Sequence, residues 1–308
     1  MLTRKDFEQI QKNTGFNLEL LEKVYHLTKI LNEIEQKSIL KENLILKGGT
    51  SLNFLYFDIP RLSIDLDFDY TGAISKNDMV KQRPNMQKEI KNIASKLGYT
   101  IKERGSSYII SRQSLQYQTI RNIKDHIKIE INYLNRISLG PINQKTLPSP
   151  FQDIPRFLVN TFSLEEITAQ KVAACISRSE PRDLYDLCFL SKQQTSIDKI
   201  KTYATVYYCM TANDNKPDIS ELDNYDLSKI QQELQQFIRN REALTPEEIL
   251  NDAKTFLSNI LTFTKHQQKF VDSFFKEKTI LPEMLDIEKS KLTNHPALLY
   301  KINNLLKS

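Results

Sequence analysis

The sequence predicts an α+β domain followed by a helical domain. Period-two alternation of apolar and polar residues, which is typical of strands, occurs only in the first half of the chain. From about residue 163 onward, apolar residues recur at the three- and four-residue spacing of helices. The 308 residues suffice for about two domains. We therefore expect an α+β core with a small mixed sheet over 1–160 and a helical domain over 161–308.

Helices and strands alternate in the first domain. Alternation is strictest over 62–70, which is the clearest strand, and Ser75 with Asp78 marks the start of a helix that ends at Gly98. In chain order we expect a helix over 17–40, a strand over 44–47, a strand over 62–70, a helix over 75–98 and strands over 108–111, 115–121 and 127–134.

The second domain reads as helical after a turn-rich segment over 141–155. One helix is expected over 163–178, and Pro181 suits the first turn of the next. A polar loop over 211–226 separates them from a later helix, which begins at the capping box of Thr245 and Glu248.

Composition narrows the class of protein. Forty per cent hydrophobic and 26% charged residues are ordinary for a globular chain, and the net charge of +5 is too small to imply a polyanionic partner by itself. Three cysteines without a CxxC pattern indicate reduced thiols. No segment resembles a signal peptide or a membrane span. We expect a cytoplasmic protein with no membrane partner.

An acidic face on the strand over 62–70 is the first candidate site. The alternation places Ser63, Asp65, Asp67 and Asp69 on one side. Neighbouring carboxylates repel by roughly 2 to 3 kcal/mol at an effective dielectric near 20. A solvated edge tolerates that repulsion, whereas a cleft calls for a hard cation such as Mg²⁺, and two ions suit this spacing. Glu130 could join the face if its strand is a neighbour.

A glycine pair is the second candidate. The chain has only seven glycines, and Gly48 and Gly49 are adjacent. Backbone amides at a glycine turn that opens a helix can bind phosphate, which makes Lys47, Gly48, Gly49 and Thr50 candidate nucleotide-binding residues. The order of a Walker A loop is absent, and an ordinary turn is the alternative. A glycine turn followed by an Asp-x-Asp strand is what nucleotidyl transfer requires.

A third group lies over 171–187. Lys171 and Arg178 share a helical face and could neutralise the charge of a triphosphate. Asp186 could orient Lys171 or Arg182, and an Arg–Asp pair that ties two helices together is the alternative. Asp183 has no assigned role at this point.

Three motifs in order resemble a known family. They are Lys47-Gly48-Gly49-Thr50-Ser51-Leu52, the run from Arg61 to Phe68, and the run from Lys171 to Leu187. Together they resemble the AbiEii-type nucleotidyltransferases, toxins of type IV toxin–antitoxin systems that include the MenT toxins of mycobacteria. The motifs span 44–190, about half of the chain.

The resemblance implies a polymerase-β-like nucleotidyltransferase core, with 161–190 contributing to the active site. It implies that Asp65 and Asp67 bind metal, that Ser63 belongs to the active-site motif, that Lys171 contacts phosphate and that Asp186 is the later catalytic aspartate. Glu130 stands where the family has an aspartate on its third strand, so its role as a metal ligand is the weakest of these assignments.

The function expected from this resemblance is a Mg²⁺-dependent transfer of NMP from an NTP to RNA, at the 3′ acceptor end of tRNA, which inhibits translation. A cognate antitoxin is the expected protein partner. Two alternatives stay open: a nucleotidyltransferase that modifies a small molecule such as an antibiotic, and a non-catalytic module that binds nucleotides or RNA.

Overall fold

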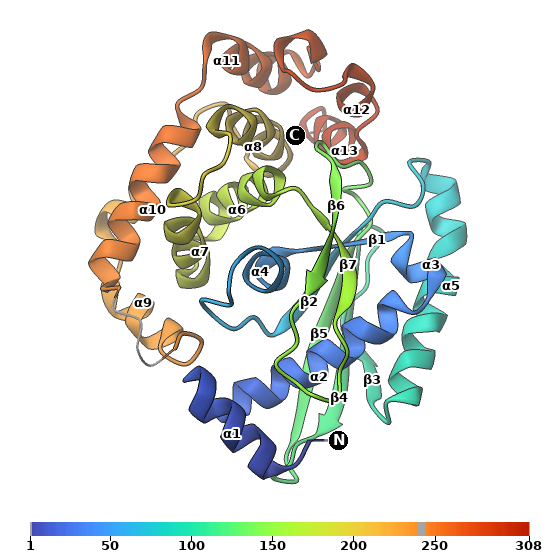
Figure 1. Ribbon diagram of the computed structural model, residues 1–308. Helices are drawn as coiled ribbons and strands as arrows, with labels where there is room; N and C mark the ends of the chain where they lie inside the picture. Colours follow the sequence, from blue (N-terminus) through green and yellow to red (C-terminus); the bar gives the residue numbers. More distant parts are fainter. Residues whose placement is uncertain (1, 240–243, 308) are drawn as a thin grey trace. The chain divides into compact units, whose positions relative to one another are not determined.

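The computed structural model describes residues 2–239 and 244–307. The chain divides into two compact units. The first comprises Met1–Arg136, Ile142–Phe162 and Gln235–Glu242, and the second comprises Ile137–Pro141, Ser163–Leu234 and Ala243–Ser308. Figure 1 shows the elements in chain order. A mixed sheet in the first unit and helices in the second confirm the predicted α+β class.

The first unit contains a seven-stranded mixed sheet with the order β3-β4-β5-β2-β1-β7-β6. Strands β2 and β5 are parallel, as are β1 and β7, and the other neighbours are antiparallel. The strands are β1 (Leu44–Lys47), β2 (Asp65–Tyr70), β3 (Thr100–Glu103), β4 (Ile110–Gln118), β5 (Lys124–Asn132), β6 (Ile142–Leu147) and β7 (Phe157–Phe162).

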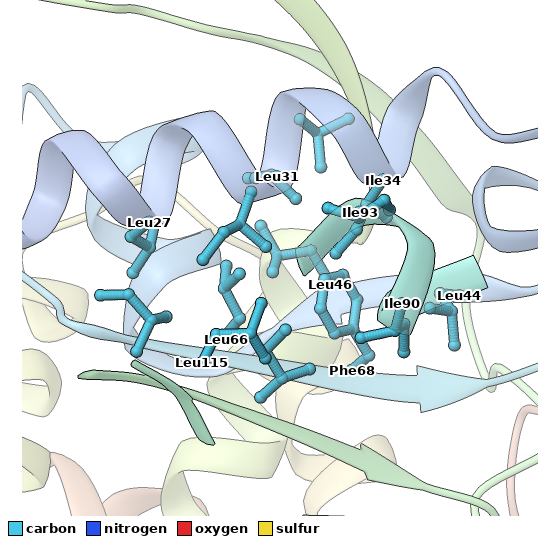
Figure 2. Close-up of a cluster of buried hydrophobic side chains, with 14 of the residues drawn as sticks. Leu27, Leu31, Ile34, Leu44, Leu46, Leu66, Phe68, Ile90, Ile93 and Leu115 are labelled. Atoms are coloured by element: carbon cyan, nitrogen blue, oxygen red, sulfur yellow. The ribbon is translucent and has the colours of Figure 1, made fainter. Parts of the chain in front are cut away.

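Helices α1 (Arg4–Thr14), α2 (Leu18–Glu35), α3 (Ser38–Lys41) and α5 (Lys76–Lys96) complete this unit, with the short α4 (Gly48–Ser51) and the one-turn π-helix η1 (Leu52–Tyr56). Figure 2 shows apolar side chains of α2 and α5 packed against the sheet. Leu31 and Ile93 come from the helices, and Leu46, Leu66 and Leu115 come from three strands; all are at most 1% exposed. This packing buries one face of the sheet, and the opposite face carries the aspartates of β2 together with the buried Ile45 of β1.

The strand prediction was incomplete at the edges. Strands β3, β6 and β7 were not predicted, and β6 lies in the segment expected to hold turns. Both β3 and β6 are edge strands: β3 has exposed residues on each face, and β6 places polar Asn143 and Lys145 on its half-buried face. An edge strand with little burial carries no clear apolar alternation, so its sequence lacks the signal.

The strand expected over 62–70 begins at Asp65. The residues before it are held differently: the Leu62 amide donates to the Phe237 carbonyl at 2.8 Å, and Arg61 forms an isolated bridge with Ile238. These contacts bring 235–239 into the first unit.

The second unit is helical. Its helices are α6 (Leu164–Arg178), α7 (Pro181–Ser191), α8 (Ile197–Thr211), α9 (Leu227–Leu234), α10 (Pro246–Leu261), α11 (Lys265–Asp272), α12 (Lys289–Thr293) and α13 (Pro296–Leu305), with the short 3₁₀-helices η2 (Ser220–Asn224) and η4 (Pro282–Met284) and the short π-helix η3 (Ser273–Glu277). The Thr245 capping box and Pro181 at the start of α7 are confirmed. None of the helices in the described ranges is both long and apolar enough to cross a membrane.

A buried carboxylate explains why 137–141 belongs to the second unit. The Glu166 side chain accepts hydrogen bonds from the amides of Leu139 and Gly140 at 2.9 and 2.8 Å. The hydroxyls of Ser138 and Tyr207 each donate to it at 2.9 Å. A fully buried carboxylate with four donors stays satisfied, so this segment is fixed to α6 and α8.

Candidate active site

The acidic face predicted on β2 is present. Asp65, Asp67 and Asp69 alternate with Leu66 and Phe68, which point into the core. Side chains two residues apart on a strand lie about 6.6 Å apart. Asp65 and Asp67 are partly exposed, whereas Asp69 is fully buried. The face therefore presents two accessible carboxylates, followed by a third in the protein interior.

The buried Asp69 has a cationic partner. Lys47, at the end of β1, places Nζ 2.6 Å from Asp69 Oδ1. Burial alone would lower the pKa of Lys47, but the Asp69 carboxylate outweighs it and the pKa is raised, so the lysine stays charged. The Asn135 amide also donates to Asp69 Oδ2, at 3.4 Å. Lys47, predicted to bind nucleotide, is thus an ion-pair partner within the strand pair.

Each glycine of the pair lies against a residue of the acidic motif. Gly48 has φ +72°, and a Cβ there would come 2.8 Å from Asp67 Oδ2. A Cβ on Gly49 would come 2.7 Å from Arg61 Nη2 and 3.0 Å from Ser63 Oγ. Side chains at these positions would displace the motif, so the chain passes directly from β1 into α4 with the backbone against it.

Hydrogen bonds fix the segment before β2. The Thr50 hydroxyl donates to the Asp65 carbonyl oxygen at 2.6 Å and lies 2.9 Å from Ser63 Oγ. Thr50 is 1% exposed and Ser63 7%. The Asn53 amide donates to the Gly49 carbonyl at 2.9 Å. The glycine turn and the start of the acidic strand therefore form one continuous hydrogen-bonded structure.

Glu130 lies where the sequence placed it. Strand β5 is the parallel neighbour of β2, and Glu130 stands opposite Asp67 on the same face of the sheet. Its carboxylate accepts a hydrogen bond from Arg112 Nε at 2.7 Å. An arginine on this carboxylate competes with a metal ion, which weakens the case for Glu130 as a metal ligand.

The donor set fits a hard divalent cation. Asp65 and Asp67 offer carboxylate oxygens, and the glycine backbone leaves the space beside Asp67 without a side chain. Within 2–239 and 244–307, no three His, Cys, Asp or Glu side chains are grouped as a closed metal site. Mg²⁺ commonly binds through one or two carboxylates and takes its other ligands from water and substrate phosphates. Two carboxylates therefore suffice.

The second unit holds a separate charged cluster. Lys171 on α6 places Nζ 2.9 Å from Asp183 Oδ1 and 2.6 Å from Asp186 Oδ2, both on α7. Arg178 donates to Asp183 through Nε at 2.6 Å and through Nη2 at 3.0 Å. Two cations and two carboxylates balance one another. This cluster brings together the predicted Lys171, Arg178 and Asp186, and Asp186 does orient Lys171.

Asp183 is the centre of this cluster, although no role was predicted for it. It is 1% exposed, and burial alone would raise its pKa. Lys171 and Arg178 instead hold that pKa well below its ordinary value. The ionised carboxylate therefore fixes both cations. A hint was present in the sequence, because Asp183 and Asp186 are three apart and share a face of α7.

Two arginines near the acidic strand had no predicted role: Arg61 stands in one of the motifs, and Arg112 was not among the candidate residues. Arg61 is 2% exposed, and its guanidinium lies against Gly49 and donates to the Leu62 carbonyl at 3.0 Å. Arg112 on β4 reaches Glu130. No local pattern predicts Arg112, because only the pairing of β4 with β5 brings it there.

The glycine turn, the paired aspartates and the mixed sheet define a nucleotidyltransferase. The model of the nucleotidyl transferase AbiEii toxin family, from type IV toxin–antitoxin systems, matches residues 29–274. That match spans roughly four-fifths of the chain. The protein thus belongs to the AbiEii family and is a nucleotidyltransferase toxin of this class, as the motifs predicted. No curated protein sequence is significantly similar to it.

Solved structures share the fold. MenT4, a nucleotidyltransferase toxin from Mycobacterium tuberculosis H37Rv, is 13% identical, with a TM-score of 0.68 over 97% of this chain and 99% of that one. JHP933 from Helicobacter pylori is 19% identical, with a TM-score of 0.52 over 86% of this chain and 100% of that one. A third structure, described as a nucleotidyltransferase from H. pylori, is 18% identical, with a TM-score of 0.50 over 80% of this chain and 96% of that one. At these identities the likeness concerns the fold.

Proposed function

We propose that the protein transfers a nucleoside monophosphate from an NTP to RNA, at the 3′ acceptor end of tRNA, in a reaction that depends on Mg²⁺ and inhibits translation. An antitoxin encoded with such a toxin would restrain it in the cytoplasm. The observation that carries the proposal is the contact between the glycine turn and the Asp-x-Asp strand, where Gly48 abuts Asp67 and Thr50 holds Ser63 and Asp65.

The reaction follows from the chemistry of these groups. The 3′ oxygen of the acceptor forms a bond to the α-phosphorus of the NTP, and the bond from that phosphorus to the bridging oxygen breaks, releasing pyrophosphate. Asp65 and Asp67 would hold Mg²⁺, which supplies positive charge and orientation for the phosphates when bound. The backbone of Gly48, Gly49 and Thr50 would contact the polyphosphate, where side chains would block its approach.

Lys171, Arg178 and Asp186 are assigned to the same reaction. The family match covers both the glycine–aspartate motifs and this cluster, which supports the assignment. Lys171 would contact phosphate, and Asp186, 2.6 Å away, would position it. Because the cluster is balanced in charge, binding a phosphate requires the lysine to exchange part of its contact with carboxylates for contact with the nucleotide.

Label transfer tests this function directly. Purified protein is incubated with Mg²⁺, total RNA and each α-labelled NTP in turn, and the labelled band identifies donor and acceptor together. Asp65→Asn and Asp67→Asn are each expected to lower transfer roughly 100-fold or more, the scale of losing an electrostatic catalytic group. Asp78→Asn, on an exposed aspartate of α5, is the matched control. Full transfer by either site variant would refute the assignment.

A further inference from the structure

The polar face of the sheet continues beyond the two aspartates as a basic surface. Across β5, Lys128 stands opposite Asp65, and Glu130 stands opposite Asp67. On β4, Arg112 is the next residue in the row of Asp67 and Glu130. Residues directly opposite one another in neighbouring strands share a face. Lys128 and Arg112 therefore project from the same face as the aspartates, and both are exposed.

The outer strand adds more cations to this face. Lys102 on β3 stands opposite Ser114, which pairs in turn with Lys128. The Arg104 amide donates to the Arg112 carbonyl at 2.8 Å, which continues the same pairing by one residue pair. Lys124 on β5 is two positions along the same face from His126 and is also exposed. We call the exposed cations of this face the basic track: Lys102, Arg104, Arg112, Lys124 and Lys128.

The track keeps a strong positive charge. Glu130 is the one acidic side chain on its face among the described residues of β3, β4 and β5, and it is bound by Arg112. Glu103 belongs to the other face, where it pairs with Lys91 of α5 at 2.9 Å. Burial, together with the cations Lys23 and Arg104, lowers the pKa of the neighbouring His126, which therefore adds no charge near neutral pH. Five cations thus face one carboxylate.

The size of the track discriminates between acceptors. From β2 to β3 there are three strand spacings of about 4.8 Å, so the cations extend to about 14 Å from the aspartates. A small-molecule acceptor has no groups to place so far away, whereas a polynucleotide carries a phosphate at every residue. The described residues of β3, β4 and β5 include no Phe, Tyr or Trp on this face, which suits phosphate contacts that do not depend on sequence.

We propose that the basic track binds the phosphates of the RNA acceptor strand and guides its 3′ end toward Asp65 and Asp67. The proposal rests on the function proposed above and specifies its acceptor as a polynucleotide held across β5, β4 and β3. Contacts to phosphate position a strand without reading its bases, so the track sets affinity, and the choice of RNA is made elsewhere.

Salt-dependent binding tests the track independently of catalysis. The triple variant K102Q/R104Q/K128Q is compared with the wild type and with K5Q/K81Q/K88Q, which removes three exposed cations from α1 and α5. Binding of a fluorescent single-stranded RNA ending in CCA is measured by anisotropy at several salt concentrations without NTP. The track variant is expected to bind about tenfold more weakly near 0.1 M salt, and its plot of log K against log salt is expected to be shallower by about 2, since each phosphate contact contributes about 0.7.

Kinetics give the second readout. In the label-transfer assay the track variant is expected to raise KM for RNA about tenfold and to leave KM for the NTP unchanged, while the control variant matches the wild type in both. If the track variant bound RNA with the same affinity and the same salt dependence as the control variant, the proposed role of the track would be wrong. The same would follow if the variant bound RNA normally and lost only an acidic protein partner.

Failure of the two proposals is distinguishable. If the wild type labels RNA and the track variant labels it equally well at low RNA concentration, the track is wrong and the transfer function stands. If the wild type binds RNA through the track but labels no RNA with any NTP, the transfer function is wrong and the binding result supports the track. Absence of RNA binding by the wild type overturns the track.

Discussion

Gly48 and Asp67 are in direct contact: a single methyl group at position 48 would lie 2.8 Å from Asp67 Oδ2. The contact joins the end of β1 to the candidate metal-binding strand. Two constraints therefore require glycine at position 48: a side chain would collide with Asp67, and the φ of +72° is one that other residues rarely adopt.

Gly48→Ala is expected to lose at least 100-fold in nucleotidyl transfer, because the Cβ displaces the Asp67 carboxylate. Gly98 offers a matched control, since it has the same φ of +72° with nothing within 4 Å of an added Cβ. Both variants should lose about 1 to 2 kcal/mol of unfolding free energy from the left-handed conformation. Transfer assays and urea unfolding of the two proteins separate strain from loss of the site. Equal activity losses would contradict the contact as the cause.

Glu130→Gln is expected to lower transfer less than tenfold, because Arg112 already engages this carboxylate at 2.7 Å. Asp67→Asn in the neighbouring strand should lower it roughly 100-fold or more. Steady-state rates at several Mg²⁺ concentrations measure the difference. If Glu130→Gln matched Asp67→Asn in both rate and Mg²⁺ requirement, Glu130 would be a metal ligand.

Asp183→Asn is expected to destabilise the second unit by about 1 to 3 kcal/mol, since the buried Lys171 loses one carboxylate and keeps Asp186, and Arg178 is largely exposed. The stabilisation that Asp183 gives the wild-type protein depends on pH. Because the pKa of Asp183 is lower in the folded protein, its stabilisation is present above about pH 4 and declines as pH falls from there toward the lowered pKa.

Urea unfolding between pH 3 and 7 measures this dependence. The difference between wild type and Asp183→Asn should shrink on acidification below pH 4. A constant difference across that range would show that ionisation of Asp183 does not contribute.

Glu35 should make the protein less stable at alkaline pH. Its side chain is 8% exposed, its Oε2 has no hydrogen-bond partner, and burial raises its pKa to about 7. The folded state therefore binds more protons than the unfolded state between about pH 4.5 and 7, so stability falls as pH rises through that window. Glu35→Gln is expected to remove this fall and to gain roughly 1 to 3 kcal/mol at pH 8. Urea unfolding of both proteins at pH 5 and pH 8 measures the change in stability. If the variant lost as much unfolding free energy between these pH values as the wild type does, the role of Glu35 would be contradicted.

The sequence predicted the acidic strand well because burial of one face imposes a period of two. Leu66 and Phe68 enter the core, so the aspartates between them must lie on the other face. Caps were equally local: Ser75 accepts from the Asp78 amide as expected. The edge strand β6 was missed because its half-buried positions hold Asn143 and Lys145 while the apolar Ile142 is exposed, so its burial alternates without an apolar alternation in the sequence.

The sequence by itself determined the family, the α+β class and the candidate residues, because motifs, caps and apolar periodicity act over a few neighbouring residues. Tertiary structure alone decided which of them meet. Gly48 contacts Asp67 because β1 and β2 are antiparallel neighbours, and Arg112 engages Glu130 because β4 pairs with β5. Asp183 became the centre of its cluster through the packing of α6 on α7. Pairing and packing join residues distant in the chain, and no local pattern records them.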